Sequence, residues 1–277
     1  NDESGSSIAL SGNGNTIIIG AAANDGNGNR SGHVRVFELI NNNWVQKGTD
    51  IDGEAIGDRF GWSVGISENG NIISAGAIFN DGNSSSSGHV RAYSFKNNSW
   101  IQLGSVIDGD YEGDQLGNAV SLSKDGAYLA VGAYGNDENG SNAGEVKVFK
   151  YENSIWKQVG SDINGESADD YFGGSVSISD DGSVLAIGAS RNDAGGTDRG
   201  HVRVYENISG SWSQIGSDID GEAAGDNSGS SVSLSSDGSI VAIGAINNNG
   251  NGSNSGHVRI YKNILGSWSQ IGQDIDG

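Results

Sequence analysis

The sequence contains no cysteine, no methionine and no proline, and only 15 of its 277 residues are lysine or arginine. Without cysteine the chain has no disulfide, no thiolate chemistry and no cysteine-bound zinc or iron–sulfur site. The 35 acidic residues give a net charge of −20, which argues against a nucleic-acid partner. No run of 18 apolar residues is present, so we expect no membrane insertion. Because the sequence lacks an initiator methionine and a signal peptide, we expect a processed form or a fragment.

Only 34% of the residues are hydrophobic, but they are spaced regularly. One tryptophan recurs at a constant interval, at Trp44, Trp100, Trp156, Trp212 and Trp268. Gly-Ala pairs keep the same spacing, at Gly20, Gly76, Gly132, Gly188 and Gly244. Such self-similarity at a fixed period indicates a repeat architecture, here with five copies.

Each copy has the pattern of four short strands. In the third copy we expect strands at 119–123, 128–133, 144–151 and 155–161, and in the fourth at 175–179, 184–189, 200–205 and 211–217. Val176 and Ile178 alternate with serines, as on a half-buried strand, whereas 185–189 is entirely apolar or small. The Asp181-Gly182 pair between these two strands is a hairpin signal. No segment has a helical period.

Four-stranded units in series predict an all-β fold, a five-bladed β-propeller in which each blade is a four-stranded antiparallel sheet from one repeat. We expect a single domain over 1–277 that closes into one ring, with repeats at about 1–56, 57–112, 113–168, 169–224 and 225–277. The alternative is an open solenoid or a part of a longer array.

Short motifs in the copies resemble a known family. Phe60-Gly61 and Phe172-Gly173 open copies, Gly-Ala ends every second strand, and Gly200 to Tyr205 reads Gly-His-Val-Arg-Val-Tyr. This resembles the FG-GAP repeat of integrin α-like propellers, and the resemblance implies an extracellular or surface binding module. The chain departs from that family in three ways: proline is missing, the calcium loop between the first two strands is only a tight turn, and there are five copies where seven blades are usual.

The acidic residues concentrate in the links between blades and in those between the second and third strands, which antiparallel topology places on one face. Closely spaced carboxylates with glycine suit calcium, which prefers oxygen ligands. The expected calcium ligands are Asp52, Glu54, Asp58, Asp108, Asp110, Asp114, Asp220, Glu222 and Asp226. The alternative is that these residues only form turns. We expect no other cofactor.

Aromatic and acidic residues on the same face are candidates for ligand binding. Three aromatic residues break the repeat and four aspartates recur in the links between the second and third strands; these candidates are Trp62, Tyr111, Tyr171, Asp25, Asp81, Asp137 and Asp193. We expect the repeated tryptophans to pack between blades rather than to stack on sugars. Acceptor motifs for N-glycosylation occur at Asn29, Asn83, Asn97, Asn139, Asn207 and Asn251, about as often as chance gives.

All four histidines occupy one repeat position, two residues before an arginine: His33, His89, His201 and His257. The third copy has Glu145 and Lys147 there. Copies of a position approach one another only on the innermost strand, so a shared metal site on this third strand is not expected. We expect each histidine to contact an acid of a neighbouring link.

These observations predict a non-catalytic recognition or adhesion module, secreted or at the cell surface, that binds an extracellular protein or a glycan through its acidic face. The alternatives are a self-assembling structural subunit of an extracellular coat or filament, and a lectin or glycosidase-like five-bladed propeller. An enzyme is not expected, because hydrolysis by carboxylates needs two distinct environments and near-identical copies supply five equal ones.

Overall fold

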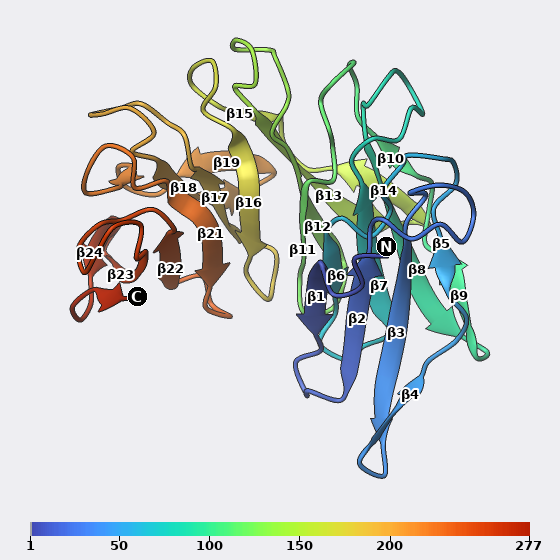
Figure 1. Cartoon of the computed structure of the whole chain (residues 1–277). Coiled ribbons are helices and arrows are strands. Elements are labelled where there is room, and N and C mark those ends of the chain that lie inside the picture. The colour runs from blue at the N-terminus through green and yellow to red at the C-terminus, as the bar shows by residue number, and fades with distance from the viewer. Residues whose placement is uncertain (1) are drawn as a thin grey trace. The chain divides into compact units, whose positions relative to one another are not determined.

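The computed structural model describes residues 2–277, which form five antiparallel sheets, one for each repeat (Figure 1). In the first sheet β1 (Ser7–Leu10), β2 (Thr16–Ala21), β3 (His33–Ile40) and β4 (Asn43–Gln46) are neighbours in chain order, and β5 (Ile51–Asp52) pairs with β3. None of the described residues is helical, and none belongs to a helix that could cross a membrane.

The other four sheets repeat this plan. The second sheet contains β6 (Val64–Ile66), β7 (Ile72–Ala77), β8 (His89–Lys96), β9 (Ser99–Gln102) and β10 (Ile107–Asp108). The third contains β11 (Ala119–Leu122), β12 (Tyr128–Ala133), β13 (Glu145–Glu152), β14 (Ile155–Gln158) and β15 (Ile163–Asn164). The fourth contains β16 (Phe172–Ile178), β17 (Val184–Ala189), β18 (His201–Ile208), β19 (Ser211–Gln214) and β20 (Ile219–Asp220). The fifth contains β21 (Ser228–Leu234), β22 (Ile240–Ala245), β23 (His257–Ile264), β24 (Ser267–Gln270) and β25 (Ile275–Asp276).

The chain forms two compact units. The first comprises Asn1–Val131 with Phe149–Gln158, and the second comprises Gly132–Val148 with Val159–Gly277. The first two sheets therefore belong to the first unit, the last two belong to the second, and the third sheet contributes residues to both. Closure of the blades into a ring, and the single domain over 1–277, stay predictions.

The strand pattern follows from the apolar residues, as the sequence predicts. All six residues of β17 are buried, because both of its faces are covered, and the first five residues of the neighbouring β18 are buried as well. One element was not predicted. An Ile-Asp dipeptide in each link, Ile-Asn in the third repeat, forms a two-residue strand, such as β20, in which Ile219 pairs with Val202 and Asp220 with His201. Two residues are too few to show an alternating pattern.

Sheets of one unit pack through the same contacts each time. The indole Nε1 of Trp212 donates a 2.9 Å hydrogen bond to the carbonyl oxygen of Val159, and Trp268 does the same to Ile215. A Cβ atom on Gly188 would clash with the carbonyl oxygen of Gly229, so glycine is required where the next sheet approaches. The repeated tryptophans therefore pack between sheets, which confirms the prediction.

The Phe-Gly pair at the start of a repeat supports this packing. Phe60 and Phe172 are fully buried, and Phe172 forms a parallel bridge with Gly144 of the preceding repeat. The following glycine, Gly173, has a φ of +85°, a left-handed conformation that favours glycine. In the fifth repeat the equally buried Ser228 takes the place of the aromatic ring.

Candidate functional site

Each sheet carries a cluster of charged residues where its third strand begins. In the first, fourth and fifth sheets the histidine and arginine of the strand face an aspartate that precedes the short fifth strand, and the fourth and fifth add a carboxylate from the preceding inter-blade link. The short fifth strand holds the link against the third strand, because the aspartate within the short strand, such as Asp220, pairs directly with the histidine. The clusters therefore arise from the repeat itself, and their differences come from single substitutions.

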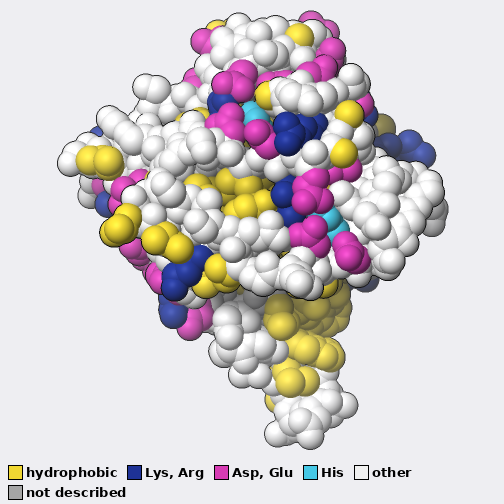
Figure 2. Space-filling view, turned by 90° about the vertical axis from the view of Figure 1, so that its left-hand side faces the viewer, with side chains coloured by type: hydrophobic (Ala, Val, Ile, Leu, Met, Phe, Trp, Pro, Cys, Tyr) yellow, Lys and Arg dark blue, Asp and Glu magenta, His cyan; other side chains and the backbone are white. Residues whose placement is uncertain are grey.

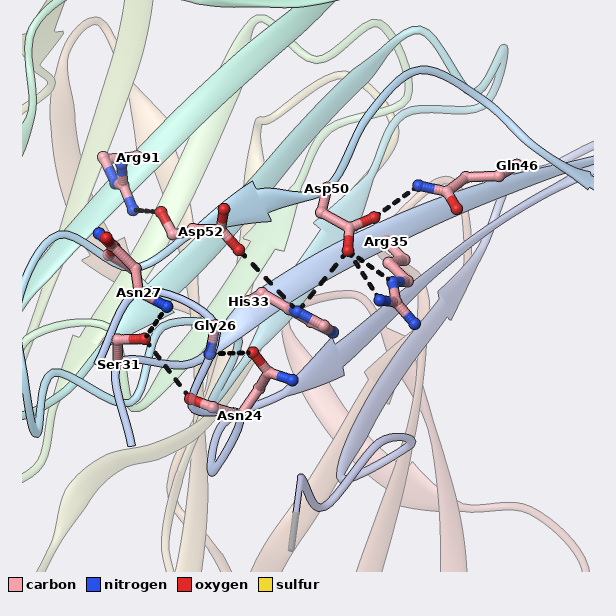
Figure 3. Close-up of polar contacts among 11 residues, drawn as sticks. Asn24, Gly26, Asn27, Ser31, His33, Arg35, Gln46, Asp50, Asp52 and Arg91 are labelled. Atoms are coloured by element: carbon pink, nitrogen blue, oxygen red, sulfur yellow. Dashed lines mark hydrogen bonds and ion pairs between the residues drawn. The ribbon is translucent and has the colours of Figure 1, made fainter. Parts of the chain in front are cut away.

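The cluster of the first sheet shows the basic geometry (Figure 3). His33 Nδ1 lies 3.9 Å from Asp50 Oδ2 and 4.0 Å from Asp52 Oδ1, while Arg35 Nη2 donates to Asp50 at 2.7 Å. Gln46 donates a further hydrogen bond to Asp50. The hydrogen bond from Arg35 is the main reason that the pKa of Asp50 lies below its usual value. Burial, with help from Arg35, lowers the pKa of His33.

The cluster of the fourth sheet is more buried. Arg203 donates two 3.0 Å hydrogen bonds to the carboxylate of Asp218 and also pairs with Glu166 of the preceding link. His201 is 1% exposed, and its Nδ1 lies 3.5 Å from Asp218 Oδ2. Burial and then the charge of Arg203 lower the pKa of His201, so the imidazole is neutral at pH 7.

The fifth sheet has the corresponding histidine, arginine, aspartate and glutamate, at longer distances from one another than in the fourth. His257 Nδ1 lies 3.8 Å from both Glu222 Oε2 and Asp274 Oδ2, and Arg259 Nη1 lies 3.8 Å from Glu222. His33, His201 and His257 thus lie close to acids of the links, as expected, whereas no such contact is described for His89 in the second sheet, where Val106 replaces the aspartate.

The third sheet differs, because Glu145 and Lys147 replace the histidine and arginine. Lys147 Nζ lies 3.3 Å from Glu145 Oε1 and 3.8 Å from Asp162 Oδ2. Both Lys147 and Glu145 are buried, whereas the Asp162 side chain is 32% exposed. Glu138 comes close enough that its carboxylate and those of Glu145 and Asp162 lie within 4.8 Å of one another. The result is a group of three carboxylates around one ammonium.

A cavity of about 300 Å³ opens beside Asp162. Its wall contains two aromatic and several polar side chains: Ser161, Asp162, Ile163, Asn164, Tyr205, Ser211 and Trp212. Burial raises the pKa of Tyr205, whose hydroxyl is hydrogen-bonded to Arg203. The cavity therefore adjoins the third and the fourth clusters at once.

The carboxylates of the third and fourth clusters are mostly paired with lysine or arginine side chains of the protein itself. Lys147 contacts two of the three acids of the third cluster, and Arg203 pairs with both acids of the fourth. A metal ion there would have to displace a buried lysine or arginine side chain.

The aspartates expected to bind calcium divide into two groups. Asp58, Asp114 and Asp226 are buried turn caps: Asp58, for example, accepts hydrogen bonds from the Ala55 amide and from Asn80 Nδ2. Of the remaining residues, Glu222 converges with His257 and Asp274 in the fifth cluster, within 4.8 Å of one another. The others lie along the links: Asp52, Glu54, Asp108, Asp110 and Asp220. Calcium binding stays a prediction.

The residues expected to bind a ligand do not form one site. Asp25, Asp81, Asp137 and Asp193 each accept a hydrogen bond from an amide five residues later, so each closes its own loop. Tyr111 is 68% exposed, while Trp62 lies beneath Arg59. The ring of Tyr171 packs at a tilt against the ring of Tyr134, and the guanidinium of Arg191 lies over the Tyr171 ring. Their role in ligand binding stays a prediction.

Among the glycosylation motifs, Asn29 and Asn97 are exposed, and Asn207 is half-buried. Asn83, Asn139 and Asn251 use their side-chain amides to donate to backbone oxygens of a link 26 residues away. A glycan on that nitrogen would compete with this hydrogen bond.

Five serially repeated antiparallel sheets with these contacts define the blades of a β-propeller. The chain belongs to the FG-GAP repeat family, whose sequence model matches residues 1–37, 44–93, 100–149, 164–205 and 218–261. This confirms the resemblance seen in the sequence. No curated protein sequence matches the chain.

Two solved structures of similar fold are lactonases. One, from Bacteroides uniformis, is described as a 6-phosphogluconolactonase; its TM-score is 0.66 at 13% identity, over 99% of this chain and 72% of that chain. The other is the periplasmic gluconolactonase of Pseudomonas aeruginosa, with a TM-score of 0.63 at 14% identity, over 98% of this chain and 71% of that chain. At such identities the likeness shows a shared fold.

These neighbours correct the predicted function. We expected a non-catalytic recognition or adhesion module, or a structural subunit, and no enzyme, yet both similar propellers are named as enzymes. The sequence argument failed because it treated the copies as equivalent. The substitutions at positions 145 and 147 were visible in the sequence, but their meeting with Asp162 beside a cavity was not.

Proposed function

We propose that this chain is a hydrolase that opens the ring of sugar-derived lactones, with the cavity beside Asp162 as its active site. The observation that supports the proposal is the asymmetry of the third cluster, where Asp162, 3.8 Å from the buried ammonium of Lys147, lines a cavity with an aromatic wall. The names of the two similar propellers suggest the substrate class.

The wall of the cavity suits a polyhydroxylated ring. Trp212 and Tyr205 offer apolar surface for the face of a sugar ring, and Ser161, Asn164 and Ser211 offer hydrogen-bond partners for its hydroxyl groups. A cavity of about 300 Å³ is at the lower end of the range for small-molecule sites. These features favour a small monocyclic substrate.

In the proposed reaction, Asp162 takes a proton from a water molecule whose oxygen attacks the lactone carbonyl carbon. The bond between that carbon and the ring oxygen then breaks, and the ring oxygen receives the proton, which gives the open hydroxy acid. Lys147 is a positioning residue, because its ammonium is buried 3.8 Å from Asp162 and holds the carboxylate in place. We further propose a location outside the cytoplasm, in keeping with the periplasmic neighbour.

The fifth sheet provides a matched control. Asp274 occupies in its repeat the place that Asp162 occupies in the third, but it faces His257 rather than a lysine and lines neither described cavity. Hydrolysis of glucono-δ-lactone is followed by acid release at constant pH, after subtraction of the spontaneous rate. We expect Asp162→Asn to lower kcat by about 10²–10⁴-fold, and Asp274→Asn to leave it unchanged.

Two outcomes would contradict the proposal. One is that the purified chain opens none of a panel of five- and six-membered sugar lactones faster than buffer. The other is that the two variants have equal activity, since the carboxylate of the third sheet would then have no special role.

A further inference from the structure

The fourth and fifth clusters contain the same three potential metal ligands: a glutamate of the preceding link, the histidine of the third strand and the aspartate before the short strand. The fourth set is Glu166, His201 and Asp218, and the fifth set is Glu222, His257 and Asp274. In each set, one ligand atom from every residue lies within 4.8 Å of the other two. All six residues belong to the second compact unit, so each set is complete within one unit.

The arginine of the third strand distinguishes the two sets. In the fourth, Arg203 donates two 3.0 Å hydrogen bonds that occupy both carboxylate oxygens of Asp218. In the fifth, Arg259 donates at 2.6 Å to the backbone carbonyl oxygen of Asp220 instead, and its Nη1 lies 3.8 Å from Glu222 Oε1. A metal ion can therefore enter the fifth set without breaking a hydrogen bond of the arginine.

The imidazole of His257 is buried and makes no hydrogen bond within residues 2–277. Its side chain is 1% exposed, and its Nε2 is buried without a partner. Its Nδ1 lies 3.8 Å from both Glu222 Oε2 and Asp274 Oδ2, which is too far for a hydrogen bond. Buried polar side chains in proteins usually have a hydrogen-bond partner. A buried imidazole that points at two carboxylates and bonds to neither therefore indicates a ligand between them.

The two carboxylates present free oxygen atoms to the same point. Gln270 donates a 2.6 Å hydrogen bond to Oδ1 of Asp274, which orients the carboxylate so that Oδ2 faces His257. Hydrogen bonds of this kind commonly orient carboxylates that bind metals. Neither Oδ2 of Asp274 nor Oε2 of Glu222 accepts a hydrogen bond from another described residue. One nitrogen and two oxygen atoms are thus available at the centre of the set.

The chemistry and spacing of these atoms select the metal. One imidazole nitrogen with two carboxylate oxygens suits zinc, whereas calcium prefers oxygen ligands alone. A tetrahedral zinc ion with bonds of about 2.1 Å holds its ligand atoms about 3.4 Å apart, so the 3.8 Å separations need to shorten only slightly. Figure 2 shows the side of the molecule on which β23 lies in Figure 1, and histidine side chains are visible there with acidic and basic side chains around them.

We propose that Glu222, His257 and Asp274 bind one zinc ion through Oε2, Nδ1 and Oδ2. Three protein ligands leave the fourth position of a tetrahedral ion for water. The ion would join the link that carries Glu222 to the sheet that carries His257, and so stabilise the packing of the fifth sheet against the link before it. The fourth set should not bind zinc, because Arg203 already occupies its aspartate.

The experiment uses matched substitutions in the two sets. Glu222→Gln removes the charge of one ligand from the fifth set, and Glu166→Gln makes the same change in the fourth; both glutamate side chains are 46% exposed, so neither change disturbs a packed core. His257→Gln and His201→Gln form a second matched pair. Zinc binding to the chain without a histidine tag is measured by titration calorimetry with an excess of calcium, in about 0.1 M NaCl, which screens exposed charges beyond about 10 Å.

We expect the unmodified chain to bind one zinc ion and to gain a rise in melting temperature that calcium does not give. Glu222→Gln and His257→Gln should each raise the dissociation constant at least tenfold, whereas both variants of the fourth set should bind zinc as the unmodified chain does. Cobalt in place of zinc should give the visible absorption of a four-coordinate ion, which Glu222→Gln should lose. The proposal would be overturned by a chain that binds no zinc in the presence of calcium, or by equal losses of affinity in Glu222→Gln and Glu166→Gln.

Discussion

The third and fourth sheets place different chemistry on the same scaffold. Both carry two titratable residues at the start of the third strand and an aspartate before the short fifth strand. In the fourth, Arg203 binds Asp218 through two hydrogen bonds and His201 is neutral beside it. In the third, Lys147 contacts Glu145 and Asp162 at 3.3 and 3.8 Å without such a fork. The two aspartates are exposed to a similar extent, 27% for Asp218 and 32% for Asp162, so the clusters differ in the cation that faces the carboxylate and in the cavity that Asp162 lines.

The largest expected effect on stability comes from removing the cation of the third cluster. Lys147→Met removes the ammonium from beside Glu145, whose side chain is 3% exposed, and leaves a buried charge without its cation. We expect the free energy of unfolding to fall by about 3–5 kcal/mol, measured by urea denaturation. The double variant Glu145→Gln with Lys147→Met should recover most of this loss. A loss below about 1 kcal/mol would mean that the pair behaves like an exposed ion pair.

The second prediction concerns the imidazoles that distinguish the other clusters from the third. Burial, followed by the charge of Arg91, lowers the pKa of His89 to about 3. Val106 stands where the first, fourth and fifth repeats have an aspartate, so no carboxylate at this position opposes the shift. The unfolded chain takes up this proton near pH 6.5 and the folded chain does not. The stability contributed by neutral His89 is therefore present above pH 6.5 and decreases at lower pH, by about 1.4 kcal/mol for each pH unit down to about 3.

A carboxylate beside His89 should flatten this pH dependence. Val106→Asp would supply the group that Asp218 supplies to His201 and would raise the pKa of His89 toward its ordinary value. The measurement compares thermal melting of both chains at pH 7, 6, 5 and 4. An equal loss of melting temperature on acidification in both chains would show that His89 does not carry the effect.

A smaller effect is expected at the packing between sheets. Trp212→Phe removes the hydrogen bond to Val159 but retains most of the apolar ring, so we expect a loss of about 1 kcal/mol. Trp44→Phe is the matched control, because this tryptophan is 47% exposed and has no described acceptor within its chain. Urea denaturation at low protein concentration should show a larger loss of unfolding free energy for Trp212→Phe than for Trp44→Phe. Equal losses in the two variants would contradict the assigned contacts.

The smallest effect concerns the charge that all clusters share. Folding gathers acidic links that the unfolded chain keeps apart, so stability should rise with sodium chloride between about 0.01 and 0.1 M. Melting at fixed ionic strength with calcium in place of sodium tests the predicted calcium sites separately. A melting temperature that follows ionic strength and ignores calcium would remove those sites and keep the screening argument.

Much of the fold could be predicted from the sequence, because the regular repeat multiplies each weak signal by five. The alternation of Val176 and Ile178 and the apolar run at 185–189 predicted two strands of the fourth sheet, which the structure places at 172–178 and 184–189. The start at Phe172 was missed because the strand is irregular between Phe172 and Ser175.

The candidate site could not be predicted in the same way. Asp162 and Tyr205 are far apart in the sequence and belong to different repeats, so no local pattern joins them. The repeat pattern also drew attention away from this site, because a comparison that averages over the copies gives no weight to residues found in one copy. Glu145 and Lys147, which make the third cluster different, are such residues. For the aspartates, composition could not separate metal ligands from turn caps, because a carboxylate in a glycine-rich link serves both purposes; Asp58 and Asp226 cap turns, and calcium binding stays a prediction.

The tryptophan contacts bear on how such a chain could grow in evolution. The indoles of Trp100, Trp156, Trp212 and Trp268 each reach a carbonyl oxygen 53 residues earlier, so this contact always joins a blade to the one before it in the chain. Duplication or deletion of one whole repeat unit therefore creates no new kind of contact and leaves no old one unmatched inside the array. Gene segments of this length can be gained or lost in a single step without a compensating mutation, whereas a change of even one residue in the spacing would put the next tryptophan out of reach.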